Sequence, residues 1–124
     1  PEIDILAPCA LGAVLDAKNI ETLSASIVCG TANNILAEPE ADGQILKNRG
    51  IVYAPDFVAN AGGVIRLAGL YLGLTETQVD EKVERIEETT LEVLRRTASH
   101  ASAYDAAVAY ARERIDAGKS AATA

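Results

Sequence analysis

The sequence contains few aromatic side chains and little histidine. Its 124 residues include one Phe, four Tyr and one His, and neither Trp nor Met. The single His100 argues against a metal site built on histidine, because such sites usually combine several ligands of this kind. Ala, Val, Ile and Leu supply most of the 49% hydrophobic content. We therefore expect one soluble domain whose core depends on aliphatic packing between helices and strands.

Clusters of basic residues are also missing. The formal net charge is −7, from 18 acidic and 11 basic residues, so no surface is suited to a row of phosphates. No apolar run approaches the roughly 18 residues that span a bilayer, and no segment resembles a signal peptide. Nucleic acid and membranes are therefore excluded from the expected partners.

Cysteine is scarce, and Cys9 and Cys29 both lie in apolar segments without a Cys-x-x-Cys spacing. We expect two reduced, buried thiols rather than a disulfide, which favours a cytoplasmic protein. The chain begins with Pro1 and enters a strand-like run at once. This beginning is interpreted as that of a piece of a longer protein.

Three short apolar runs predict buried parallel strands, at residues Ile3–Ala7, Ser26–Gly30 and Gly50–Ala54. Their spacing leaves room for helical crossovers, so we expect right-handed βαβ units and an α/β fold. Ala10, Val14 and Leu15 indicate a short amphipathic turn in the first crossover. In the second, Ile45 and Leu46 indicate a helix that ends at Gly50.

The second half of the sequence is typical of helices. An apolar helix is predicted from Gly63 to Leu72. Thr75–Gln78 and Ser102–Asp105 carry the pattern of helix N-caps. The helices that follow have apolar residues at helical spacing: Val79, Val83, Ile86 and Val93 in one, and Tyr104, Val108, Ala111 and Ile115 in the other. We expect structural roles for both, and a frayed tail at residues 118–124.

Small residues and carboxamides follow the three predicted strands. The exits are Ala7–Ala10, Gly30–Asn34, and the segment from Pro55 to Gly63, which includes Asn60. Ligands of open parallel sheets bind beyond the carboxyl ends of the strands, and small residues allow a flat ligand to approach. The carboxamides suit a ligand with its own amide or carboxylate. The alternative is that these are ordinary turn residues, with Asn33 and Asn34 capping the next helix.

No established catalytic motif is present. The sequence lacks a Walker motif, Gly-x-Gly-x-x-Gly and a Ser-His-Asp set. Cys9 is either a nucleophile or a small buried hydrophobic residue, and Asp56 is either a general base or a turn-forming residue. We therefore predict no catalytic residue in this chain.

Three segments carry a resemblance to a known family: "APCALGAVL" (7–15), "CGTANNILAE" (29–38) and "GIVYAPDFVANAGGVI" (50–65). In order and spacing they resemble the C-terminal part of the NAD-dependent amino-acid dehydrogenases. The nearest group is the leucine, valine and phenylalanine enzymes, relatives of glutamate dehydrogenase. The resemblance implies a partial Rossmann-type domain at residues 1–73, with C-terminal helices packed on it at 74–117.

The resemblance also assigns site residues. It implies an NAD crevice and a substrate pocket, with Asn60 shared by both. The cofactor-binding residues would be Ala7, Pro8, Cys9, Ala32, Asn33 and Asn60, and the substrate-binding residues Asn60, Gly62, Gly63, Val64 and Leu67. The aliphatic Val64 and Leu67 imply an apolar substrate, such as a branched-chain amino acid that is oxidatively deaminated to a 2-oxo acid and ammonia.

The sequence departs from the family in what it omits. The lysines and the aspartate that transfer protons in this family, the glycine-rich turn and the ribose-binding acidic residue have no counterpart here. Gly69 and Leu70 stand where leucine-type enzymes usually carry an acidic pair.

Three interpretations follow from these departures. The chain is a fragment of a dehydrogenase that is inactive alone, a non-catalytic module that binds nicotinamide or an amino acid, or a self-assembling structural domain. Since Ile3–Ala7 would form an open strand edge, we expect a homo-oligomer.

Overall fold

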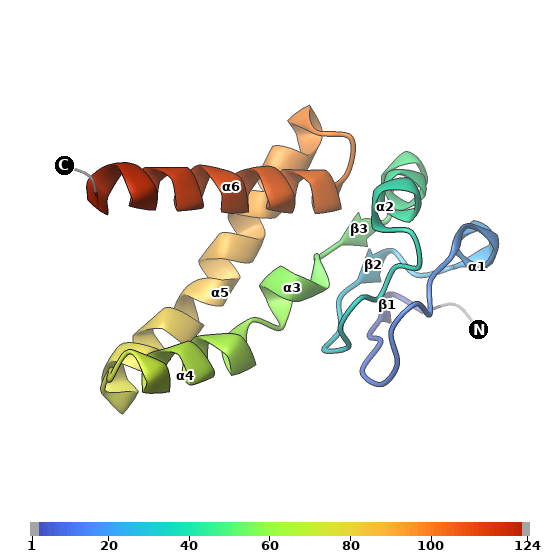
Figure 1. The fold of residues 1–124 in the computed structure, drawn as a ribbon. Helices are drawn as coiled ribbons and strands as arrows, with labels where there is room; N and C mark the ends of the chain where they lie inside the picture. Colours follow the sequence, from blue (N-terminus) through green and yellow to red (C-terminus); the bar gives the residue numbers. More distant parts are fainter. Residues whose placement is uncertain (1–2, 123–124) are drawn as a thin grey trace.

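The computed structural model describes residues 3–122, and three parallel strands organise its first half (Figure 1). The strands are β1 (Ile5–Leu6), β2 (Ile27–Val28) and β3 (Val52–Tyr53). They lie in the order β1-β2-β3. The predicted α/β fold with three parallel strands is confirmed. Strands β1 and β3 are shorter than their apolar runs, because Pro8 and Pro55 follow them closely and proline has no N–H for the ladder.

Two crossover helices connect the strands, α1 (Ala17–Thr22) and α2 (Pro39–Asn48). The expected amphipathic turn over residues 10–15 is wrong: Leu15 is extended there and forms an isolated bridge with Leu36. Helix α1 begins later, because Asp16 and Asn19 form a capping box around its first turn. The second crossover is as predicted, and Gly50 follows α2 with a φ of 71°, which favours glycine.

The core of this first half lies on one face of the sheet. Val28 and Tyr53 point into it and are buried, together with Leu46 of α2. The alternate residues Ile5, Ile27 and Val52 share a register and face the other way. Within residues 3–122 nothing covers this second face: Ile5 is 58% exposed, and Ile27 and Val52 are exposed as well.

The second half is helical, as predicted. It follows the single turn α3 (Asp56–Ala59) and contains α4 (Gly62–Tyr71), α5 (Glu76–Arg96), the 3₁₀ turn η1 (Thr97–Ser99) and α6 (Ala103–Ala122). Helix α5 runs diagonally between α4 and α6 in Figure 1. The predicted capping box is present at Thr75 and Gln78. Ser102 also caps α6, since its Oγ accepts a hydrogen bond from the Asp105 N–H at 3.1 Å.

The C-terminal helix differs from prediction in its length and its packing. Helix α6 continues to Ala122, so residues 118–122 are helical, and the expected fraying of this tail stays a prediction. Positions 123 and 124 lie outside the described residues. Ala111 and Ile115 follow the predicted spacing, yet both are exposed, because α6 extends past the helices that bury its first turns (Figure 1).

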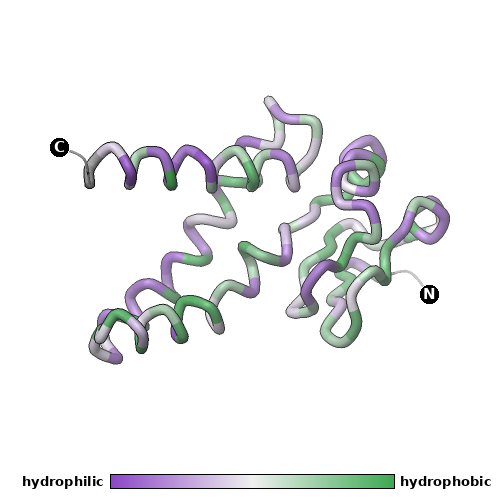
Figure 2. The backbone as a smooth tube through the Cα atoms, viewed as in Figure 1, coloured by the Kyte–Doolittle hydropathy of each residue, from purple (hydrophilic) through white to green (hydrophobic). Residues whose placement is uncertain are grey.

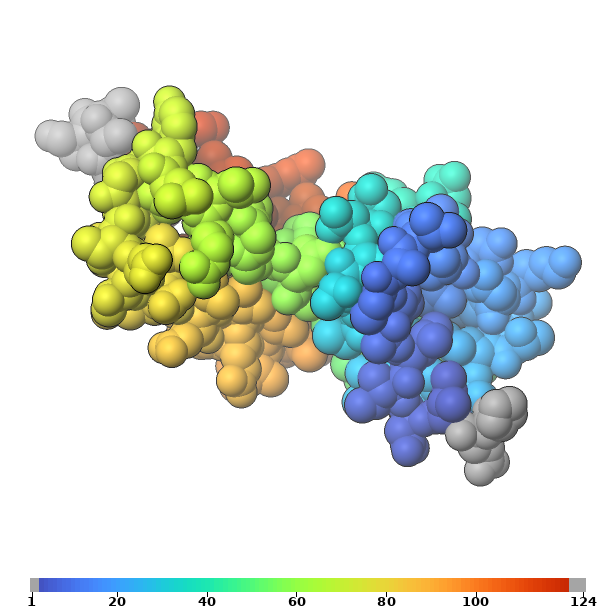
Figure 3. Space-filling view, turned by 90° about the horizontal axis from the view of Figure 1, so that it is seen from below, coloured from blue at the N-terminus to red at the C-terminus, as the bar shows by residue number. Residues whose placement is uncertain are grey.

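Hydropathy is distributed unevenly along this fold. Figure 2 shows a largely hydrophobic α4, beside α5 with its mixture of polar and apolar positions. In Figure 3, residues around α3 and the start of α4 lie between the sheet and the other helices. Among the described helices, none combines the length and apolar character required to cross a membrane.

Candidate functional site

The exits of β1 and β2 are in direct contact. The Ala32 N–H donates to the Pro8 carbonyl oxygen at 3.0 Å. Gly30 lies so close to this backbone that an added Cβ would stand 2.0 Å from the Pro8 oxygen. Only glycine fits such an approach. The first two segments predicted to line a cofactor crevice therefore meet at the carboxyl end of the sheet.

The exit of β3 reaches the same place through Asn60, the C-terminal cap of α3. Asn60 Nδ2 donates to Asn33 Oδ1 at 2.7 Å and also lies 3.3 Å from the carbonyl oxygens of Thr31 and Ala32. Three oxygens around this nitrogen fix the orientation of the Asn60 amide. We name the Asn33 and Asn60 side chains the amide bracket.

The amide bracket retains two polar atoms for a ligand. Among the described residues, no group hydrogen-bonds to Asn33 Nδ2 or to Asn60 Oδ1. The bracket thus presents one donor and one acceptor, the complement of a carboxamide. The alternative that Asn33 and Asn34 cap the next helix is wrong, because α2 begins at Pro39 with Glu38 as its N-cap.

Cys9 lies beside Thr31 at the same end of the sheet. Hydrogen bonds from the Thr31 side chain and backbone lower the pKa of the Cys9 thiol. Both cysteines are free, as expected, but the expectation that they are buried is wrong, because both are exposed.

Asp56 is a buried structural residue in this fold. Its Oδ2 accepts from the Ile35 N–H at 3.3 Å, and its Oδ1 accepts from the Tyr53 hydroxyl at 3.2 Å. With both oxygens engaged, the arrangement favours the turn-forming alternative over a general base. Tyr53 and Thr31 were missed by the sequence reasoning. The sequence signal that could have found Tyr53 is its spacing of three residues before Asp56.

The predicted substrate-binding residues of α4 point in different directions, unlike the paired amides of the bracket. A Cβ on Gly62 would lie 3.9 Å from the side chains of Val83 and Ile86, so this glycine faces α5, whereas Gly63 faces open space. Val64 and Leu67 are 64% and 70% exposed, and their spacing puts them on one face of α4.

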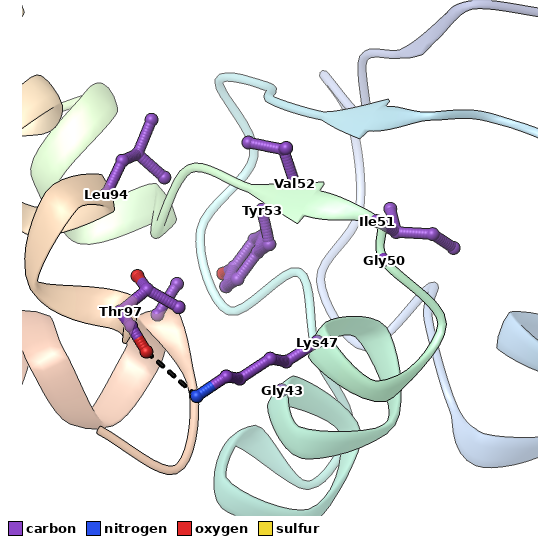
Figure 4. A pocket seen from close by; sticks show the side chains of 9 residues that line it. Gly43, Lys47, Gly50, Ile51, Val52, Tyr53, Leu94 and Thr97 are labelled. Carbon is purple, nitrogen blue, oxygen red and sulfur yellow. Dashed lines mark hydrogen bonds between the residues drawn. The ribbon is translucent and has the colours of Figure 1, made fainter. Parts of the chain in front are cut away.

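Two of the larger cavities lie away from the amide bracket. The first, of about 260 Å³, lies between α2, β3 and the end of α5 (Figure 4). Lys47 Nζ crosses it to donate to the Thr97 carbonyl oxygen at 2.9 Å. The second is a groove of about 810 Å³ between α3, α4, α5 and α6, with Ile65 and Ile86 in its wall. Among the described residues, no cluster of three His, Cys, Asp or Glu side chains could hold a metal ion.

Together, these features define a class of protein. Small residues and two carboxamides converge at the carboxyl ends of parallel strands, which is where Rossmann-type α/β domains bind their ligands. The three strands are thus part of a Rossmann-like domain, as the resemblance implied.

Comparison with known proteins gives the family. The family model of Glutamate/Leucine/Phenylalanine/Valine dehydrogenase matches residues 1–122. The chain therefore belongs to this family of amino-acid dehydrogenases.

Individual relatives agree with this assignment. The chain is 50% identical over 92 residues to the leucine dehydrogenase of Thermoactinomyces intermedius, covering 74% of this chain and 25% of that protein. It is 46% identical over 94 residues to the valine dehydrogenase of Streptomyces albus, covering 76% and 26%. The crystal structure of L-tryptophan dehydrogenase from Nostoc punctiforme aligns with a TM-score of 0.87 at 38% identity, over 96% of this chain and 37% of that chain. The chain thus spans about a quarter of the length of the relatives that it matches.

Proposed function

We propose that this chain supplies the nicotinamide and substrate wall of an NAD-dependent L-amino-acid dehydrogenase, which converts an apolar amino acid to a 2-oxo acid and ammonia. The observation that carries the proposal is the amide bracket, where Asn60 of one strand exit meets Asn33 of another. Its position at the carboxyl end of a parallel sheet, in a chain of this family, supports the assignment.

The residues present fit a nicotinamide group. The donor at Asn33 Nδ2 and the acceptor at Asn60 Oδ1 complement the carboxamide of nicotinamide. The crevice around it would be lined by Ala7, Pro8, Cys9 and Ala32. The absence of a side chain at Gly30 lets its backbone lie directly against Pro8 in this lining. When bound, NAD accepts the hydride from the amino acid. The bracket's task is to hold both partners in register, which is how positioning accelerates a reaction.

The substrate would lie between the amide bracket and α4. Asn60 would orient its carboxylate, and the small Gly62 and Gly63 would leave space beside the helix. Val64 and Leu67 present aliphatic side chains from one face, which favours an apolar and branched substrate side chain.

The 124-residue chain alone would not turn over substrate. Among the described residues, no lysine and no carboxylate side chain hydrogen-bonds to Asn33 or Asn60. Proton transfer needs such a group within hydrogen-bond reach of the substrate. We expect no NAD reduction when the chain is incubated with leucine or valine, and turnover would overturn this point.

Binding is the direct test of the amide bracket. NADH fluorescence titration of the wild-type chain should give weak, saturable binding. Asn60→Ala should abolish it because the acceptor and the contact with Asn33 are both lost. The matched control is Asn48→Ala, at the exposed end of α2, which should leave the titration unchanged. Equal binding by wild type and Asn60→Ala would contradict the proposal.

We further propose that the isolated chain self-associates. Ile5 of β1 is exposed, and within residues 3–122 this strand pairs only with β2, which supports strand addition by a second copy. Sedimentation velocity should show oligomers that Ile5→Lys dissociates. Leu70→Lys, at an exposed apolar position of α4, is the control, and a monomer at high concentration would exclude the proposal. The two free thiols support our further proposal of a cytoplasmic location.

A further inference from the structure

Asp56 is the first residue of α3, and its carboxylate is buried. Asp56 is only 6% exposed. It accepts hydrogen bonds from the backbone N–H of Ile35 at 3.3 Å and from the hydroxyl of Tyr53 at 3.2 Å. A buried carboxylate needs such donors, because an unpaired charge in the interior is strongly disfavoured.

One of these bonds reaches the loop that carries Asn33. Ile35 is fully buried and follows Asn34, whose φ of 52° lies in the left-handed region. The same stretch is held from its other side by the Ala13 N–H, which donates to the Asn34 carbonyl oxygen at 2.6 Å. Asp56 therefore anchors the loop two residues beyond Asn33.

The backbone of Asp56 fixes the other half of the amide bracket. The Asn60 N–H donates to the Asp56 carbonyl oxygen at 2.8 Å and ends the single turn of α3. One residue thus holds Asn33 through its side chain and Asn60 through its backbone. The two amides come from strand exits that are 27 positions apart in the sequence.

Tyr53 holds Asp56 through two hydrogen-bond contacts. Its side chain is buried beside α2 (Figure 4), and its hydroxyl oxygen also lies 3.4 Å from the Asp56 N–H. Burial raises the pKa of Tyr53, and the charge of Asp56 raises it further. The hydroxyl therefore stays protonated at neutral pH and remains a donor to the carboxylate.

We propose that Asp56 is a positioning residue, which sets the distance and orientation between Asn33 and Asn60 in the amide bracket. The ligand of the bracket, nicotinamide and substrate carboxylate, rests on the proposed function. The positioning itself is a property of the free protein. It can therefore be tested without any ligand.

The chain offers a matched control in Asp42. This aspartate is also buried, at 2% exposure, and its Oδ2 accepts from the Glu38 N–H at 2.7 Å in the first turn of α2. It resembles Asp56 in burial and in its bond to a backbone N–H. Within residues 3–122 the Asp42 side chain makes no hydrogen bond to the bracket, so its loss should lower stability without moving Asn33 or Asn60.

The experiment is ¹⁵N NMR of the full 124-residue chain, with the side-chain amides of Asn33 and Asn60 assigned from Asn→Ala variants. Asp56→Asn should shift both side-chain amide resonances and accelerate exchange of the Ile35 backbone amide about tenfold, since a charged hydrogen bond is lost. Asp42→Asn should leave all three signals in place. Unmoved signals in Asp56→Asn, or equal movement in both variants, would overturn the proposal.

A second pair decides the matter if Asp56→Asn fails to fold. Tyr53→Phe removes one of the two donors to the Asp56 carboxylate and leaves the Ile35 N–H, so it should shift the same resonances less far. Tyr110→Phe, whose hydroxyl accepts from Arg114 at 3.1 Å, should not shift them. An NADH titration of each folded variant separates the two proposals. Moved resonances in a chain that never binds NADH would refute the proposed function and leave the positioning role intact.

Discussion

The two halves of this protein are stabilised in different ways. The sheet half (residues 3–60) contains a core of large aliphatic residues, with Ile20, Ile35 and Leu46 fully buried. The helical half (residues 61–122) has a second cluster of only Val93, Ala106 and Ala107. Since hydrophobic stabilisation follows buried apolar area, most of it comes from the sheet half.

Polar contacts take a larger share in the helical half. Arg96 bonds to Glu92 at 2.7 Å and to Glu113 at 2.6 Å, which joins α5 to α6. The same guanidinium stacks on Tyr110 at 4.7 Å. Meanwhile Leu67 and its apolar neighbours on α4 stay exposed. The helical half therefore depends on local caps, close helix contacts and surface charge more than on a core.

Core truncation should give the largest effect and test the comparison directly. Leu46→Ala should lower the free energy of unfolding by about 2–5 kcal/mol, because a fully buried side chain is lost from the large core. Val93→Ala removes two methyl groups from the small core and should cost roughly 1.5–3 kcal/mol. Urea denaturation followed by circular dichroism measures both. An equal or larger loss for Val93→Ala would contradict the comparison.

Two glycines of α4 sharpen the description of the helical half. A Cβ on Gly69 would stand 2.4 Å from Val79 Cγ2, whereas one on Gly63 would meet open space. Gly69→Ala should therefore destabilise the α4–α5 contact by about 1–3 kcal/mol through overpacking. Gly63→Ala should be neutral or stabilise by up to about 1 kcal/mol, since alanine favours helices. Thermal unfolding of both variants measures this difference in stability. Similar melting temperatures for the two variants would disprove this account of α4.

The pH dependence of stability tests the role of the buried Tyr53 hydroxyl in the sheet half. The folded-state pKa of Tyr53 is raised above its ordinary value of about 10. The unfolded chain therefore releases this proton first, so the stabilisation is complete below pH 10 and is lost as the pH rises further. The slope reaches about 1.4 kcal/mol per pH unit. Tyr53→Phe should flatten this decline in urea titrations above pH 10, and Tyr110→Phe should leave it as in wild type.

Helix caps should give the smallest effects and show where local structure matters more. Capping boxes are present at Thr75 of α5 and at Asp16 of α1. Each change to alanine removes one cap worth about 1 kcal/mol. Circular dichroism should report a larger loss of helix for Thr75→Ala, since α5 has 21 residues and α1 has six. A larger loss for Asp16→Ala would reverse the comparison.

Local signals in the sequence were reliable guides to much of this fold. The parallel strands, α2 with Gly50 after it, and the caps at Thr75 and Ser102 follow from patterns within a few residues. The bracket pair Asn33 and Asn60 was expected near one sheet edge because parallel strands end together. Their direct hydrogen bond could not be predicted, since it depends on the single turn of α3 and on the loop at Ile35.

Other features depend on contacts between distant segments. The same alternation that buries Val28 exposes Ile27, and the alternation alone does not tell which face of the sheet is covered by helices. The exposure of Cys9 and the burial of Asp56 are likewise set by partners far along the chain, as is the unpacked end of α6. The sequence by itself determined the periodicity, the caps and the small residues at the strand exits, because these act through neighbouring residues. Only the tertiary structure decided which side chains share a hydrogen bond, because burial and pairing depend on residues that the chain brings together from a distance.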